Sequence, residues 1–186
     1  MVVQLERKRF TVTDFQQMVD AGILQEDDRC ELLNGEVINM SPIGRRHASK
    51  VNRLAQLFHE IARGTIIVSS QNPIELGPFS QPEPDIGLLR WQEDFYESGH
   101  PKAKDVYLLV EVADTTLETD RNIKLPLYAQ TGIVEVWIVN LQDNLIEVYR
   151  QPIGIDYTVT QIFTSGQTLT IEALPEISIE VNHILG

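Results

Sequence analysis

The chain has 186 residues, of which 15 are Lys or Arg and 27 are Asp or Glu, so its formal net charge is −12. With 42% hydrophobic and 23% charged residues, the composition is typical of a folded globular protein and excludes a disordered or fibrous chain. No stretch approaches the roughly 18 apolar residues of a membrane-spanning helix. The N-terminus lacks the apolar core of a secretory signal, and the lone Cys30 excludes an intramolecular disulfide. We therefore expect a cytoplasmic protein without membrane contact.

The excess of acidic residues limits the partners that the chain can bind. Affinity for nucleic acid comes largely from Lys and Arg that displace counterions, so a sequence pI near 4.7 argues against a protein that simply coats DNA. The same acidity leaves open a site whose negative charge is offset by a divalent metal ion.

The first half of the chain shows clear element signals. Asn34-Gly35 is the strongest short turn signal for a hairpin, and apolar residues at helical spacing end at Gly64. In chain order, the patterns predict a short helix over 11–20, a β-hairpin over 30–40, a helix over 46–62, strands over 66–69, 73–76 and 84–89, and an exposed connection or short helix over 90–104.

The second half adds a central strand and a second helix. Residues 106–112 are almost continuously apolar, which is typical of a strand covered on both faces. A helix is predicted over 117–130, where Pro126 indicates a late start or a kink. A second hairpin is predicted from strands over 134–139 and 145–149, and short β pieces over 157–160 and 169–171. The predicted fold class is α+β (α/β-like): a mixed sheet with two substantial helices, in a single domain spanning 1–186.

Two carboxylates stand out because of their positions on predicted strands. Asp85 opens a strand after Pro82-Glu83-Pro84, and Glu111 lies near the end of the most hydrophobic strand. Burying an ionised carboxylate is costly without hydrogen bonds, a cation or a metal ion. If the two strands are neighbours, both side chains can converge on one Mg²⁺ or Mn²⁺ ion. The alternative is that each carboxylate caps a strand end in solvent.

Three further residues are candidates for the same site. Lys124, on the helix after Glu111, can polarise a water molecule or steady developing charge beside a metal ion. Its alternative is an Asp120–Lys124 surface pair, which contributes only roughly 0.2–0.5 kcal/mol. Glu31 is either a further member of this site or a cross-strand surface charge. His47 either contacts phosphate or assists in proton transfer, or it is an exposed histidine at a helix end. The phosphate-loop, dinucleotide-binding, nucleophile-elbow and zinc-helix motifs are all absent from the sequence.

The motifs occur in a recognisable order. They are Cys30-Glu31-Leu32-Leu33-Asn34-Gly35-Glu36-Val37, Ser41-Pro42, His47, Pro82-Glu83-Pro84-Asp85-Ile86, Leu109-Val110-Glu111-Val112, Asp120 through Lys124, Tyr128-Ala129, Gly132 and Val134-Glu135-Val136-Trp137-Ile138-Val139. This set resembles the Uma-type putative restriction endonuclease family of bacteria, in the PD-(D/E)XK nuclease superfamily. The resemblance covers about 10–151, which leaves 152–186 as a C-terminal β extension.

The resemblance implies a restriction-endonuclease-like central mixed β-sheet flanked by helices, with an N-terminal β-hairpin. It implies that Asp85 is the aspartate of the Pro-Asp motif and Glu111 the acidic residue of the (D/E)XK motif. These two would bind Mg²⁺, or Mn²⁺, together with the Val112 carbonyl. The superfamily lysine normally stands two residues after the acid, where this chain has Ala113; Lys124 on the following helix matches the family's displaced lysine.

The remaining roles also follow from the resemblance. Glu31 matches the family's early acidic residue, which would aid the metal shell or orient water, and His47 matches a frequent family histidine. The implied reaction is hydrolysis of DNA phosphodiester bonds. Positive charge gathers near the start of the long helix, where the helix dipole also favours phosphate, so His47, Arg46 and Lys50 are candidates for binding the substrate. Superfamily nucleases often act as dimers, and the apolar late strands are candidates for such an interface.

Two other functions stay open at this point. The first is a catalytically inactive nuclease-fold module that binds or interacts, which the net charge of −12 and Ala113 favour. The second is an enzyme that uses the same metal site on RNA or a small phosphoester. Cleavage that depends on Mg²⁺ separates the first from a nuclease, and a panel of substrates separates the second.

Overall fold

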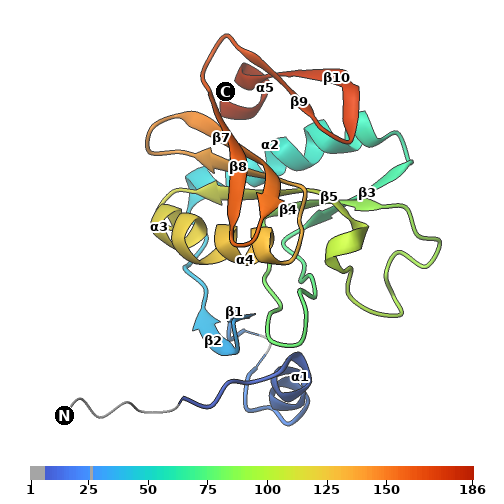
Figure 1. Cartoon of the computed structure of the whole chain (residues 1–186), viewed down its shortest axis with the longest axis vertical. Helices are drawn as coiled ribbons and strands as arrows, with labels where there is room; N and C mark the ends of the chain where they lie inside the picture. Colours follow the sequence, from blue (N-terminus) through green and yellow to red (C-terminus); the bar gives the residue numbers. More distant parts are fainter. Residues whose placement is uncertain (1–6, 26) are drawn as a thin grey trace.

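The computed structural model describes residues 7–25 and 27–186. Its centre is a six-stranded sheet in the order β3-β4-β5-β6-β7-β8, with helices on both faces (Figure 1). Only β5 and β6 run parallel, and every other neighbouring pair is antiparallel. The predicted α+β class with a mixed central sheet is therefore confirmed. The strands are β3 (Ile66–Ser70), β4 (Ile86–Arg90), β5 (Val106–Ala113), β6 (Glu135–Asn140), β7 (Leu145–Ile153) and β8 (Asp156–Phe163).

The N-terminal part forms a small unit at one end of the sheet (Figure 1). Helix α1 (Val12–Asp20) starts at a capping box, in which Thr11 and Asp14 exchange hydrogen bonds. The predicted hairpin consists of β1 (Cys30–Leu33) and β2 (Glu36–Asn39). At its turn Asn34 and Gly35 have φ angles of 52° and 82°, the left-handed conformation that a two-residue hairpin turn of type I′ needs at both positions.

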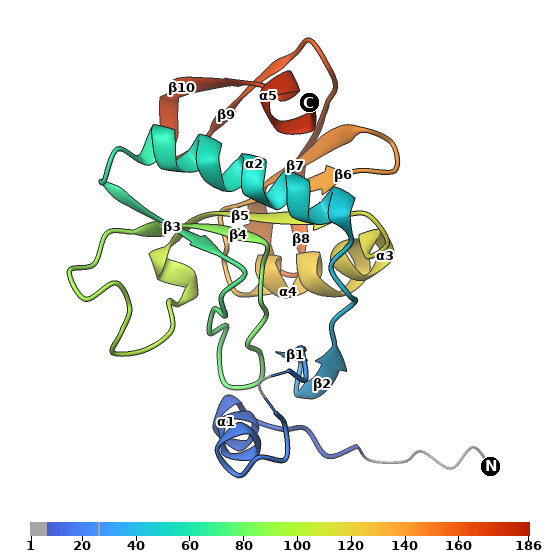
Figure 2. The ribbon, with the colours of Figure 1, turned by 180° about the vertical axis from the view of Figure 1, so that it is seen from behind.

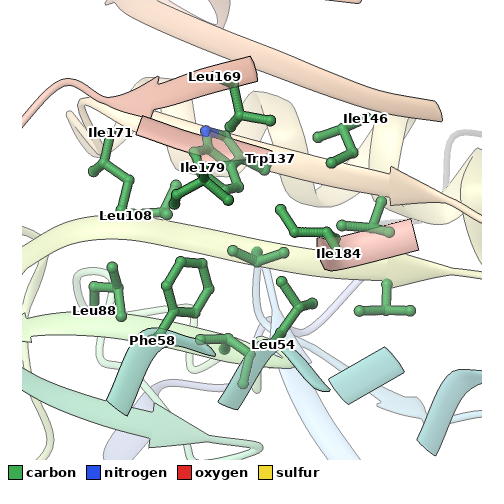
Figure 3. Close-up of a cluster of buried hydrophobic side chains, with 14 of the residues drawn as sticks. Leu54, Phe58, Leu88, Leu108, Trp137, Ile146, Leu169, Ile171, Ile179 and Ile184 are labelled. Atoms are coloured by element: carbon green, nitrogen blue, oxygen red, sulfur yellow. The ribbon is translucent and has the colours of Figure 1, made fainter. Parts of the chain in front are cut away.

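Helix α2 (Arg45–Ala62) covers one face of the sheet and defines the first core cluster. Leu54 and Phe58 point from this helix toward the sheet, and Trp137 of β6 lies with its ring 6.0 Å from that of Phe58 (Figure 3). Strands β9 (Thr168–Ile171) and β10 (Leu174–Glu180) pair with each other, and helix α5 (Val181–Leu185) follows them. Their apolar side chains join the same cluster, so the C-terminal elements lie on the α2 side of the molecule.

The opposite face is covered by a broken helix (Figure 2). It consists of α3 (Leu117–Thr119), a π-helical turn η2 (Asp120–Lys124) and α4 (Leu125–Gln130). These elements connect the parallel strands β5 and β6, and α4 contributes to a second core cluster. Pro126 lies in the first turn of α4. Since proline has no N–H, the α-helical bond to the Asn122 carbonyl cannot form, and the chain adopts a wider turn just before it.

One predicted strand is absent from the structure, and one predicted helix has an unexpected local form. The segment 73–76 is not a strand: its main chain bonds to surrounding loops, with Ile74 N donating to Pro82 O and Leu76 N to Ser80 O. The helix predicted over 117–130 is present, and the disturbance expected from Pro126 takes the form of the π-helical turn between α3 and α4. The connection over 90–104 contains turns and leads into a 3₁₀ helix, η1 (Ala103–Asp105). No helix among the described residues is long and apolar enough to cross a lipid bilayer.

Candidate active site

Asp85 and Glu111 are brought together by the pairing of β4 and β5. These strands are antiparallel with Ile86 opposite Val110, and the same register places Asp85 opposite Glu111. Asp85 precedes the first residue of β4, so its side chain lies at the end of the sheet. Its Oδ2 accepts a hydrogen bond from the Val112 N–H at 2.8 Å. The side chains of Asp85 and Glu111 both line one cavity.

Asp85 is held by two further side chains. His47, in the first turn of α2, has its Nε2 3.0 Å from Asp85 Oδ2. Gln71 donates from Nε2 to Asp85 Oδ1 at 3.3 Å and from its main-chain N–H to the Asp85 carbonyl at 3.1 Å. An ionised carboxylate only accepts hydrogen bonds, so Nε2 of His47 carries the proton. This bond raises the pKa of His47 above its ordinary value, although burial opposes it.

Glu111 is almost completely buried, with 3% of its surface exposed. Its Oε1 accepts a hydrogen bond from the Tyr128 hydroxyl at 2.5 Å and lies 3.3 Å from Lys124 Nζ. Burial raises the pKa of Glu111 well above its ordinary value, and the charge of Lys124 only partly opposes this effect. Burial therefore disfavours the ionised form of Glu111 unless a cation lies nearby.

Glu31 reaches the site from the N-terminal hairpin. Leu32 and Gln81 form an isolated antiparallel bridge, which docks β1 against the loop that leads to Asp85. Next to this bridge, Glu31 Oε2 accepts a hydrogen bond from the Glu83 N–H at 3.2 Å and lies 3.1 Å from Lys124 Nζ. Glu31 is 5% exposed, so the interpretation as a surface charge is wrong.

Lys124 connects the two glutamates from the π-helical turn. It is 5% exposed, and its ammonium lies between Glu31 and Glu111. Burial alone would lower the pKa of Lys124, but the carboxylates of Glu111 and Glu31 reverse the effect and hold it above its ordinary value. The alternative of an exposed Asp120–Lys124 pair is wrong: Asp120 is 4% exposed and accepts a hydrogen bond from Thr116 Oγ1 at 2.7 Å.

A cavity of about 200 Å³ lies among these residues. Its walls come from the hairpin, the loop into α2, the end of the sheet and the π-helical turn. Six carboxylates line it, against the cationic side chains of Arg29 and Lys124, so the cavity favours a bound cation. The lining carboxylates are those of Glu31, Glu83, Asp85, Glu111, Asp114 and Asp120.

Arg46 and Lys50 are not part of the cavity wall, whereas His47 is. Arg46 donates to the Leu141 carbonyl and lies 3.7 Å from Asp114, a residue of the cavity wall. Lys50 donates to the Leu185 carbonyl near the C-terminus. Arg46 is turned by about 100° from His47 on the helix, and Lys50, nearly one turn further on, reaches the C-terminus instead of Asp85. The predicted substrate contacts of Arg46 and Lys50 would therefore lie outside the cavity.

Sequence reasoning missed several residues of this site. Gln71 and Glu83 lie in loops without a periodic pattern, and their roles follow only from the docking of the hairpin. Tyr128 could have been predicted beside Lys124, because it stands four residues later and thus on the same side of a helix. Asp120 was considered only as a surface partner of Lys124.

The donor atoms fit a hard divalent cation. In the described ranges 7–25 and 27–186, no three His, Cys, Asp or Glu side chains are grouped to hold a metal ion. Asp85 and Glu111 supply carboxylate oxygens. The Val112 carbonyl points to the same side of β5 as its N–H, which faces Asp85. Two carboxylates and a carbonyl, completed by water, suit Mg²⁺, which usually keeps several of its water molecules.

A family model described as "Putative restriction endonuclease", Uma2, matches residues 12–182. The chain belongs to the Uma2 family. The match extends past residue 151, so this Uma2 chain carries the family pattern through β9 and β10 as well. The family resemblance predicted from the sequence is confirmed, and membership supports a nuclease-like function of the restriction-endonuclease type.

The fold has a counterpart among solved structures. A crystal structure from Anabaena variabilis, titled as a putative nuclease belonging to DUF820, superposes with a TM-score of 0.73 at 13% sequence identity. The superposition covers 95% of this Uma2 chain and 97% of the other chain. At that identity the likeness shows a shared fold. No curated protein matches the sequence.

Proposed function

We propose that this Uma2 protein is a metal-dependent endonuclease that hydrolyses DNA phosphodiester bonds. One observation carries the proposal: Asp85, Glu111 and Lys124, from three different elements, meet at one buried acidic cavity in a chain of a restriction-endonuclease family. Asp85, Glu111 and the Val112 carbonyl would hold Mg²⁺ or Mn²⁺. The proposed metal ion would lower the pKa of a bound water molecule and offset charge on the scissile phosphate.

Lys124 has a positioning and electrostatic role in this proposal. Glu31 and Glu111 raise its pKa, so at neutral pH the side chain is an ammonium and cannot accept a proton. It can donate hydrogen bonds to the attacking water or to a phosphate oxygen, where negative charge develops in the transition state. Glu31 and Glu111 both pair with the ammonium and thereby orient it.

Substrate binding is proposed at the start of α2. His47 lines the cavity, and its Nδ1 is a buried atom without a hydrogen-bond partner among the described residues. Arg46 and Lys50 lie on the same helix and contribute positive charge, as does the helix N-terminus. These cations would counter the repulsion between DNA and a chain of net charge −12. A cytoplasmic location and a homodimeric assembly belong to the same proposal.

The test combines metal binding with cleavage. Mg²⁺ and Mn²⁺ are titrated by calorimetry into the native protein and into Asp85→Ala, and plasmid nicking is assayed in the same buffers. We expect binding and nicking by the native protein and loss of both in the variant. Glu118→Gln, an exposed carboxylate on α3, serves as the matched control that changes neither.

Lys124→Ala separates positioning from metal binding. We expect its turnover to fall by about 100-fold or more, the scale of a lost transition-state donor, while metal affinity changes less. Metal binding without nicking of any substrate would contradict the nuclease proposal and favour an inactive binding module. Cleavage of RNA but not DNA would correct the substrate.

A further inference from the structure

Tyr128 lies behind the site rather than in the cavity. It is 0% exposed, it is not among the residues of the cavity wall, and the proposed reaction does not use it. Its ring belongs to the second core cluster, with Leu109, Leu127 and Ile133. Its hydroxyl donates a hydrogen bond of 2.5 Å to Glu111 Oε1. A buried hydroxyl held by core packing thus contacts one oxygen of a proposed metal ligand.

The two oxygens of Glu111 have different surroundings. Oε1 receives the Tyr128 hydroxyl and lies within ion-pair distance of Lys124 Nζ. A carboxylate oxygen offers about two lone-pair sites, so these two donors leave Oε1 little capacity for another contact. Oε2 has no hydrogen bond within the part of the chain that the structure describes. One oxygen of Glu111 is therefore occupied and the other is open.

The two donors occur together because of their spacing. Lys124 and Tyr128 stand four residues apart: Lys124 ends the π-helical turn, and Tyr128 lies one turn later on α4. The arrangement is set by the core and exists before any ion binds.

We propose that Tyr128 is a positioning residue that restricts Glu111 to one metal-binding oxygen and thereby makes the site prefer Mg²⁺ over Ca²⁺. The inference rests on the proposed function. Mg²⁺ requires a small, nearly ideal octahedral shell and commonly takes one oxygen from each carboxylate. Ca²⁺ accepts six to eight ligands and often binds both oxygens of a carboxylate. Occupation of Oε1 by Tyr128 and Lys124 blocks the second mode.

The test is a comparison of two metal ions in one variant. Tyr128→Phe removes only the hydroxyl, and calorimetry with MgCl₂ and CaCl₂ gives both dissociation constants. We expect the ratio of the Mg²⁺ to the Ca²⁺ dissociation constant to rise by about tenfold, the scale on which groups that orient metal ligands act. Tyr157→Phe is the control, because it removes a partly buried hydroxyl that donates to the Ile133 carbonyl at 2.8 Å, away from Glu111.

An unchanged ratio in a folded Tyr128→Phe variant overturns the inference. So does a native protein that binds Ca²⁺ more tightly than Mg²⁺, a measurement that needs no variant and holds even if Tyr128→Phe does not fold. Either result leaves the proposed nuclease intact, provided that the native protein binds Mg²⁺ and nicks DNA. A native protein that binds neither ion overturns both the proposed function and this inference.

Discussion

Glu111 and Glu135 are two buried glutamates on neighbouring strands, with opposite surroundings. Glu135 is 0% exposed, and both of its oxygens accept hydrogen bonds. Its Oε1 receives Trp137 Nε1 at 2.7 Å and Arg150 Nη2 at 2.7 Å, and its Oε2 receives the Glu172 N–H at 2.7 Å. Arg150 is the residue directly opposite on β7 and also donates to the Thr170 carbonyl.

The difference between the two glutamates separates a structural role from a functional one. Glu135 is satisfied by donors from β6, from β7 and from the loop after β9, so it joins the C-terminal elements to the sheet. Glu111 has one satisfied oxygen, an open oxygen and a raised pKa caused by burial. A buried acid that remains incompletely paired destabilises a fold unless a ligand completes it. The following predictions test this contrast, beginning with the largest effect.

Glu135→Ala is expected to lower the free energy of unfolding by about 3–5 kcal/mol, because it leaves the partly buried Arg150 guanidinium without its main partner. Urea denaturation at pH 7 measures this loss. Glu172→Ala is the control, since that carboxylate is exposed and as far as 4.0 Å from Arg150 Nε. We expect its free energy of unfolding to change by less than about 1 kcal/mol. Equal losses in the two variants would refute the structural role of Glu135.

Glu111→Gln is expected to leave the free energy of unfolding within about 1 kcal/mol of native, because Lys124 keeps its ion pair with Glu31 and the amide oxygen can still accept the Tyr128 hydrogen bond. The same change should weaken Mg²⁺ binding by about 100-fold, which corresponds to about 3 kcal/mol. Denaturation and calorimetry on one sample measure both effects. A stability loss as large as that of Glu135→Ala would show that the two glutamates do not differ in role.

Asp120, a third buried acid near Glu111, is expected to make the free energy of unfolding depend on pH. Burial raises its pKa from 3.8 to about 6, so the folded state holds this proton more tightly than the unfolded state. The free energy of unfolding therefore falls as the pH rises from about 4 to about 7, on the order of 2–3 kcal/mol in total. Asp120→Asn should flatten this fall, measured by urea denaturation between pH 4 and 7.5. Superimposable pH profiles would exclude a buried titration of Asp120.

Thr116→Val is expected to cause the smallest change in the free energy of unfolding. Thr116 donates to Asp120 at 2.7 Å, and this bond favours the ionised carboxylate. Its loss should cost about 1 kcal/mol at pH 7, where Asp120 is ionised, and less at pH 4, where it is protonated. Denaturation at the two pH values measures the difference, and equal losses at both would mean that Thr116 acts through packing.

Local patterns account for the parts of the fold that were predicted. Asn34-Gly35 determines the hairpin turn through two left-handed residues, and the apolar run over 106–112 identifies a strand buried on both faces. Asp85 and Glu111 were found because an acid at the opening or end of a buried strand needs a partner. Each of these inferences depends on a residue and its immediate neighbours.

The missed features depend on contacts between distant segments. Nothing near Glu135 in the sequence shows that Arg150 lies opposite, since this follows only from the register of β6 and β7. The role of Glu31 requires the bridge between Leu32 and Gln81, which are 49 positions apart. Pro126 predicted a disturbance of its helix, but neither the π-helical turn nor the burial of Asp120 could be read from it.

The π-helical turn also determines which way the side chains of the following helix α4 point. Its characteristic bond runs from Leu125 N to Asp120 O, five residues apart instead of four, so the turn holds about one residue more than an α-helix would. One residue of an α-helix corresponds to a rotation of about 100°. Deleting a single position within this turn would therefore rotate Lys124 and Tyr128 out of alignment with the sheet or force α4 to shift along its axis. Loss of one residue here would disrupt the site even though every proposed catalytic side chain remained in the sequence.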